Sequence, residues 1–137
     1  MKFALLDASV MVALFDDADA QHERYVSKMQ STAGLMLATT WPCVTEASYL
    51  LSPRNHLALL QWLRKGGADV IGFDVTDLDA MMAWMKAYTE PRTTLVDLAD
   101  ASLVWLGERL GCIHLLTEDR RDFLRYRLSD GRAFEIL

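Results

Sequence analysis

The chain alternates between short apolar segments and longer segments of helical periodicity, and this alternation limits its possible folds more than any other feature. Apolar runs of strand length occupy residues 2–6, 35–39, 69–75, 112–117 and, as a possible edge strand, 134–137. Helical patterns occupy residues 9–15, 20–31, 41–51, 56–66, 78–90 and 95–111. Strands separated by helices form βαβ units, whose parallel sheet is covered by helices on both faces. The sequence therefore predicts an α/β fold: a three-layer α/β/α sandwich with a mostly parallel central sheet of 4–5 strands.

Cap and turn residues support several of these helix boundaries. Ser9 is expected to cap the first helix, because a serine side chain accepts a hydrogen bond from the N–H groups of a first helical turn. Pro42 suits the first turn of the helix at 41–51, where its missing N–H costs nothing. Gly66 with Gly67, and Gly111, are expected to end the helices at 56–66 and 95–111.

Length and composition indicate one globular domain over residues 1–137. Hydrophobic residues make up 52% of the chain, which is enough for a full core. The net charge of −5 argues against a broad basic surface for nucleic acid, but it allows a local basic patch beside an acidic pocket. Cys43 and Cys112 have no metal-binding spacing, so we expect buried free thiols in a reducing cytoplasm. Because Asp7 interrupts the apolar N-terminal segment, we do not expect a signal peptide there, and no segment reaches membrane-spanning length.

Acidic residues occur at the points where the predicted strands end. Asp7 directly follows the first strand, and Asp119 comes two residues after the fourth. Glu46 lies in the first turns of the helix that follows the second strand, while Asp97 and Asp100 begin the otherwise apolar run 95–111 without a nearby Lys or Arg. Because the carboxyl ends of parallel strands share one edge of a sheet, we expect these acids to converge there.

Such convergence is unfavourable unless a cation lies among the acids. Neighbouring carboxylates repel one another, and oxygen ligands without His or Cys suit Mg²⁺ or Mn²⁺ better than Zn²⁺. Each acid alone also has a simple structural explanation. Asp97 with Thr94 is close to a capping box, Asp7 can cap a helix, Asp119 can be a solvated loop residue, and Glu46 can be an exposed helix residue. Asp100 lies too deep in its helix to be a cap, and the five acids together favour a metal site.

Four segments of the chain follow one another in the order "LLDASVMVALFD", "TEASYLL", "DLADASLVWLGERLG" and "LLTEDRRDF". Together they resemble a PIN domain, most closely that of the VapC toxins of VapBC toxin–antitoxin pairs. No single segment is specific, but their order and spacing extend the resemblance from residue 2 to about residue 127.

The resemblance implies a Mg²⁺- or Mn²⁺-dependent endoribonuclease on a Rossmann-like sandwich. By position, the catalytic acids are Asp7, Glu46, Asp100 and Asp119. The expected metal ligands are Asp7, Asp100, Asp119 and the extra acid Asp97. Ser9 and Thr117 match supporting hydroxyl residues near the first and fourth acids. The pattern leaves open whether Asp97 or Asp100 is nearer to the metal, and we favour Asp100.

The same resemblance implies an RNA substrate and a cognate VapB-like antitoxin. Arg120 and Arg121 follow the fourth acid, where they either contact RNA phosphates or belong to a solvated helix face. An acidic pocket also accepts a basic side chain, so we expect the antitoxin to insert an Arg or Lys there. An amphipathic antitoxin helix is expected in a groove between the helices at 20–31 and 41–51. The high apolar content predicts a homodimer.

Two alternatives retain an α/β fold without this activity. A PIN-fold protein could bind RNA or protein without catalysis, although all the matched acids are present. The second alternative is a metal-dependent phosphatase of another α/β family, such as the haloacid dehalogenases. That chemistry needs a second Asp two residues after the first, where this chain has Ser9, and a catalytic Lys that is absent near these acids.

Overall fold

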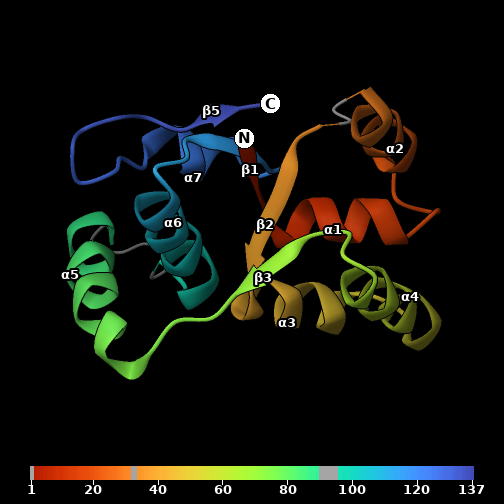
Figure 1. Cartoon of the computed structure of the whole chain (residues 1–137), viewed down its shortest axis with the longest axis horizontal. Coiled ribbons are helices and arrows are strands. Elements are labelled where there is room, and N and C mark those ends of the chain that lie inside the picture. The colour runs from red at the N-terminus through yellow and green to blue at the C-terminus, as the bar shows by residue number, and fades with distance from the viewer. Residues whose placement is uncertain (1, 32–33, 90–95) are drawn as a thin grey trace.

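The computed structural model describes residues 2–31, 34–89 and 96–137, in which five strands form one fully parallel sheet (Figure 1). The strands are β1 (Phe3–Leu6), β2 (Met36–Thr40), β3 (Asp69–Ile71), β4 (His114–Leu116) and β5 (Glu135–Ile136). Their order across the sheet is β3-β2-β1-β4-β5, and Leu5 of the central strand pairs with Ala38 on one side and Leu115 on the other. The predicted parallel sheet, including its fifth edge strand, is confirmed.

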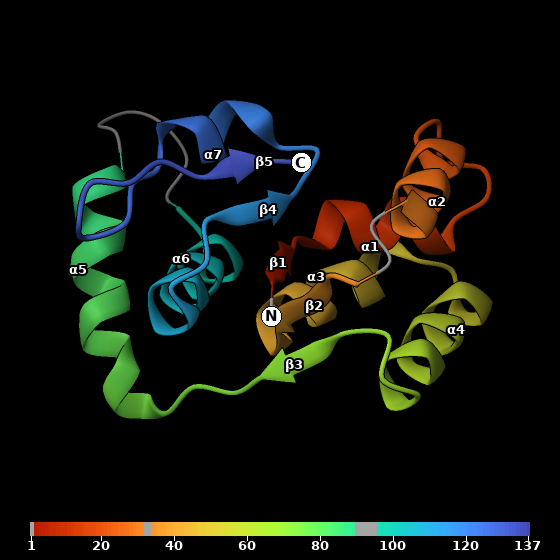
Figure 2. The ribbon, with the colours of Figure 1, turned by 45° about the horizontal axis from the view of Figure 1, so that its top comes forward.

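Helices cover both faces of this sheet. They are α1 (Ala8–Phe15), α2 (His22–Ser31), α3 (Trp41–Leu50), α4 (Pro53–Arg64), the 3₁₀ helix η1 (Val75–Asp77), α5 (Leu78–Tyr88), α6 (Leu98–Leu110) and α7 (Arg120–Arg125). Figure 2 shows α1, α2, α3 and α4 on one side of the strands, with α5 and α6 on the other. The predicted three-layer sandwich is therefore confirmed.

Most of the apolar run 95–111 forms α6, which has more buried residues than the other helices described. Leu103 and Leu106 are fully buried, and the helix contacts β1, β2, α3 and α5. Gly111 ends it with a left-handed φ of 61°, as the sequence predicts. The apolar character of this run therefore reflects contact with neighbours on several sides.

Two local predictions are wrong. Ser9 does not cap α1: Asp7 is the cap, with extended backbone angles and a carboxylate that accepts the N–H of Ala8 at 2.8 Å. The strand predicted at 69–75 ends at Ile71, because Asp74 begins η1 instead. The N–H of Asp74 donates to the Asp77 carboxylate at 2.8 Å, and this capping arrangement takes the backbone away from the sheet.

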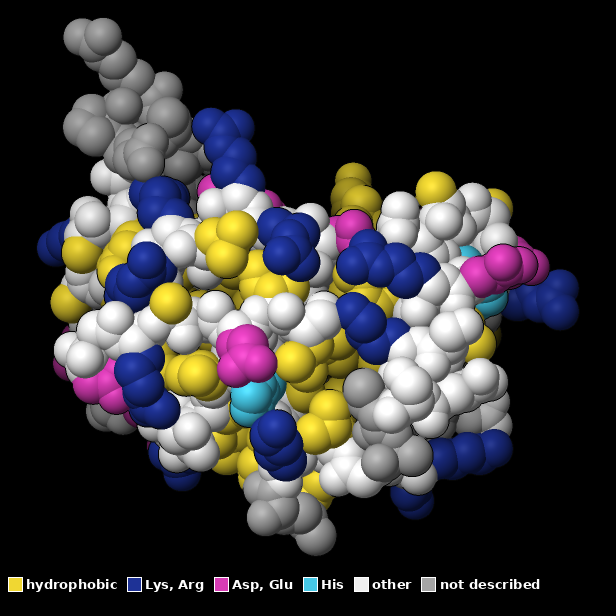
Figure 3. Space-filling view, turned by 90° about the horizontal axis from the view of Figure 1, so that it is seen from above, with side chains coloured by type: hydrophobic (Ala, Val, Ile, Leu, Met, Phe, Trp, Pro, Cys, Tyr) yellow, Lys and Arg dark blue, Asp and Glu magenta, His cyan; other side chains and the backbone are white. Residues whose placement is uncertain are grey.

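Other predictions concern the cysteines and the surface. Cys43 and Cys112 are both buried and free. The described parts of the chain contain no helix that is long and apolar enough to cross a membrane. On the face seen in Figure 3, Lys and Arg side chains are scattered and do not merge into one broad basic surface. The end of the predicted 78–90 helix and the Thr94 half of the predicted capping box lie outside the described residues.

Candidate metal-binding active site

Asp7 is a buried carboxylate held by hydrogen bonds at the carboxyl edge of the sheet. Its N–H donates to the carbonyl of Leu116, which continues the pairing of β1 with β4. One side-chain oxygen accepts the N–H of Ala8, and the other accepts the hydroxyls of Ser9 at 3.1 Å and Thr117 at 2.6 Å. Only 5% of Asp7 is exposed. The carboxylate is therefore fixed in one orientation.

Ser9 and Thr117 connect Asp7 to the loop that follows β4. The hydroxyl of Thr117 accepts the N–H of Asp119 at 2.9 Å, and that of Ser9 accepts the N–H of Glu118 at 3.0 Å. Each hydroxyl thus donates to Asp7 and accepts from this loop, so the position of Asp119 is coupled to that of Asp7. This geometry supports the expectation that both hydroxyl residues have supporting roles.

Asp97 and Asp100 have different surroundings at the start of α6. Asp97 is the N-cap of the helix, and its carboxylate accepts the N–H of Asp100 at 2.8 Å. Asp100 points inward, where the buried phenol of Tyr126 donates to its carboxylate at 2.8 Å. The capping explanation therefore holds for Asp97, although this exposed side chain also borders the site. Asp100 is the better placed of the two to bind an ion.

One cavity of about 640 Å³ contains every acid that the sequence singles out. The predicted acids along its wall are Asp7, Glu46, Asp97, Asp100 and Asp119. Ser9 also lines this cavity, whereas Thr117 lies behind it in contact with Asp7. Of the two predicted phosphate-binding arginines, Arg121 lines the cavity and Arg120 does not.

Asp122 is a further acid of this cavity that the sequence reasoning missed. Carboxylate oxygens of Asp100, Asp119 and Asp122 lie within 4.8 Å of one another. The sequence feature that could have indicated Asp122 is its spacing from Asp119, which places both carboxylates on one face of a helix. In the sequence this spacing looks the same as the charge pattern of a solvated helix face.

Burial and mutual repulsion disfavour ionisation of these acids. Burial raises the pKa of Asp7, and burial together with the charge of Asp97 raises the pKa of Asp100 to about 8. The pKa of Glu46 is also raised, by burial and then by Asp97. For Asp119, burial and the neighbouring Asp122 raise the pKa. Without a cation, the site therefore binds protons in its place.

The donor set fits a hard divalent cation. Carboxylates of Asp100, Asp119 and Asp122 are close enough together to share one ion, and Asp7 faces the same space. No His or Cys of the described residues lines this cavity, so the ligands suit Mg²⁺ or Mn²⁺ better than Zn²⁺. A cation would also balance the mutual repulsion that, after burial, raises the pKa values of these acids.

The fold agrees with comparisons to known proteins. The model of the PIN domain family matches residues 4–128, nearly the whole chain. The chain belongs to the PIN domain family. The predicted resemblance is thereby confirmed, and the matched region includes each of the acids described above.

The chain is similar to a ribonuclease in sequence and to two solved structures in fold. Ribonuclease VapC26 of Mycobacterium tuberculosis is 26% identical to this chain. The alignment of the two sequences is 137 positions long and covers 97% of this chain and 98% of VapC26. The crystal structure of VapC20 from the same organism, a toxin that cleaves the sarcin–ricin loop, has a TM-score of 0.68 at 16% identity, with 82% of this chain and 86% of that one covered. VapBC2 of Rickettsia felis, bound to a DNA fragment of its promoter, has a TM-score of 0.65 at 11% identity, with 98% of each chain covered.

Proposed function

We propose that this chain is a metal-dependent endoribonuclease, the toxin of a VapBC-type toxin–antitoxin pair. The observation that carries the proposal is the convergence of Asp7, Glu46, Asp100 and Asp119 on one cavity at the carboxyl edge of the sheet. Membership of the PIN family and the near full-length match to a VapC ribonuclease support the substrate class. The whole chain, residues 1–137, is proposed to act as a single domain.

The acids divide into ligands and a group that acts on water. Asp7, Asp100 and Asp119, with Asp122, would hold Mg²⁺ or Mn²⁺, while Asp97 caps α6 and adds negative charge. When bound, the cation supplies charge stabilisation at the phosphate and lowers the pKa of water. Glu46 faces the same cavity from α3, where its carboxylate can orient the attacking water and accept its proton.

Arginine at the edge of the cavity supports a phosphate-bearing substrate. Arg121 lines the cavity wall, so its guanidinium can pair with a phosphate oxygen of the RNA backbone. Arg120 lies outside the wall, and any contact it makes is with RNA beyond the reacting phosphate. The cavity therefore offers both carboxylate ligands for a cation and, in Arg121, a hydrogen-bond donor for the RNA backbone.

A VapB-like antitoxin is the proposed partner, and an apolar surface leads to the site. Tyr49 and Leu50 at the end of α3 are 88% and 60% exposed, and Leu50 also lines the acidic cavity. An antitoxin helix that covers these side chains can place an Arg or Lys among the carboxylates. The homodimer stays a prediction, supported by exposed apolar side chains such as Met82 on α5. The free, buried cysteines support the proposed cytoplasmic location.

Cleavage of a structured RNA tests the proposal directly. The purified chain should cut RNA with Mg²⁺ or Mn²⁺ and stop when EDTA is added. Asp7→Asn should reduce the rate by about 100-fold or more because it removes an anionic ligand, yet it should keep the fold because Asn also caps helices. The matched control is Asp69→Asn, at the exposed first position of β3, which should cleave like wild type. Cleavage that survives EDTA, or persists in Asp7→Asn, would show that the metal mechanism is wrong. RNA binding without cleavage would favour the non-catalytic alternative.

A further inference from the structure

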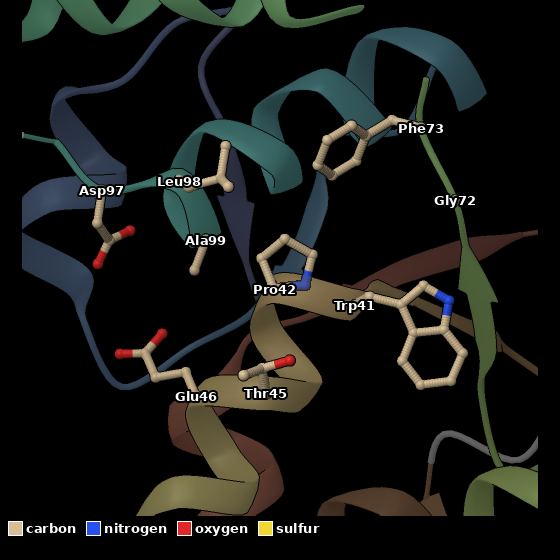
Figure 4. Close-up of a pocket in the computed structure, with 9 residues that line it drawn as sticks. All are labelled: Trp41, Pro42, Thr45, Glu46, Gly72, Phe73, Asp97, Leu98 and Ala99. Carbon is tan, nitrogen blue, oxygen red and sulfur yellow. The ribbon is translucent and has the colours of Figure 1, made fainter. Parts of the chain in front are cut away.

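A second recess lies beside the acidic cavity and shares part of its wall. Its volume is about 770 Å³, and Glu46 and Asp97 line both spaces. Figure 4 shows these carboxylates on one side of the recess and the rings of Phe73 and Trp41 on the other, with Pro42 and Leu98 between them. A molecule bound in the acidic cavity can therefore extend into this recess past Glu46 and Asp97.

The apolar wall of the recess is held by packing behind it. Phe73 packs against Trp105 of α6 in an edge-on arrangement, with ring centroids 5.7 Å apart. Pro42 belongs to the first turn of α3, where the next residue, Cys43, is fully buried. Leu98 is 42% exposed at the start of α6. The recess therefore presents flat, partly exposed apolar surfaces on elements that are anchored in the core.

The chemistry of this wall suits a flat ring that carries hydrogen-bond donors. Aromatic side chains stack on unpaired bases of RNA, and carboxylates accept hydrogen bonds from amino groups of bases. An aliphatic side chain of a protein would satisfy the apolar wall but offer nothing to Glu46 or Asp97. Uracil has no amino group, and its single donor on that edge, N3–H, lies between two carbonyl oxygens that would repel the carboxylates, whereas adenine, cytosine and guanine each present an amino group.

We propose that this recess binds an unstacked base of the RNA beside the cleaved phosphodiester. The base stacks on Phe73 and donates from its amino group to Glu46 or Asp97, so the site prefers adenine, cytosine or guanine over uracil at that position. This inference rests on the proposed ribonuclease function and deepens it by assigning a base-selecting subsite to the chain.

The test uses the full chain with Mn²⁺ and hairpin RNA whose single-stranded loop is randomised, with the cut ends sequenced. Wild type should show a preference against uracil at one position next to the cut. Phe73→Ala should raise KM for the preferred loop about ten-fold, with a smaller change in kcat, and should flatten the preference because stacking is lost. Phe73→Leu keeps apolar bulk against Trp105, so it should retain the fold and still lose the preference. The control Val75→Ala removes an 82% exposed apolar side chain outside the recess and should change neither quantity.

The outcomes separate this inference from the proposed function. Wild type that cuts RNA while folded Phe73→Ala and Phe73→Leu retain its base preference would overturn the subsite alone. A wild-type preference for uracil at this position would do the same. Variants that keep the preference but escape inhibition by the antitoxin would identify the recess as a protein-docking surface, which also overturns it. No cutting of any RNA by wild type would refute both proposals.

Discussion

Replacing Asp100 by Asn should stabilise the metal-free protein near neutral pH, although the same change should abolish cleavage. Burial, with the charge of Asp97, raises the pKa of the Asp100 carboxyl from 3.8 to about 8. Between these values the folded protein holds a proton on this group that the unfolded chain has released. The free energy of unfolding therefore falls as pH rises, by about 1.4 kcal/mol per pH unit from this group alone.

The size of the effect follows from that slope. Stability contributed by the protonated carboxyl is complete below about pH 4 and is lost progressively up to about pH 8. At pH 7 the accumulated loss is about 4 kcal/mol, a large share of the total of about 5–15 kcal/mol for a typical domain. Asn cannot ionise and has nearly the same shape, and its amide oxygen can still accept the hydrogen bond from Tyr126. Asp100→Asn should thus gain up to about 4 kcal/mol at pH 7 and close to nothing at about pH 4.

Urea unfolding in EDTA, followed by circular dichroism at several pH values between about 4 and 8, measures this gain. Asp69→Asn removes one exposed carboxylate from β3 and is expected to stay within about 0.5 kcal/mol of wild type at each pH. Excess Mn²⁺ should raise the free energy of unfolding of the wild-type protein, and it should raise that of Asp100→Asn by less. If Asp100→Asn loses stability with pH as steeply as wild type does, the reasoning about this buried carboxyl is refuted.

Two further substitutions separate capping and positioning from metal binding. Asp97→Ala should lower the free energy of unfolding by about 1 kcal/mol because the N–H of Asp100 loses its acceptor. Asp97→Asn should keep the cap. Equal urea midpoints for the two variants would contradict the capping role. Tyr126→Phe should keep the fold but weaken Mn²⁺ binding by about 10-fold or more, because Asp100 loses the phenol that orients it. Titration of free Mn²⁺ by electron paramagnetic resonance measures this, and an unchanged affinity would show that Tyr126 has only a packing role.

Much of the fold could be predicted from the sequence because its signals are local. Strand-length apolar runs and helical periods lie within a few residues of one another, and parallel strands joined by helices allow few arrangements. The same logic placed Asp7, Glu46, Asp100 and Asp119 at one edge, since the direction of each element determines where its end lies. Errors arose where two local signals competed. Asp7 and Ser9 could both cap α1, and the residues after Ile71 could continue β3 or begin η1.

Only the tertiary structure decided which of these side chains touch. Asp122 joins Asp100 and Asp119 because the first turn of α7 and the start of α6 border the same cavity. Tyr126 reaches Asp100 for the same reason, across 26 residues of sequence. The recess beside the site combines α3, the segment after β3 and the start of α6, which no local pattern connects. By itself the sequence determined the order of the elements and the edge where the acids gather, because those depend on chain direction. Distances between side chains depend on how elements pack, and packing is settled by contacts between residues far apart in the chain.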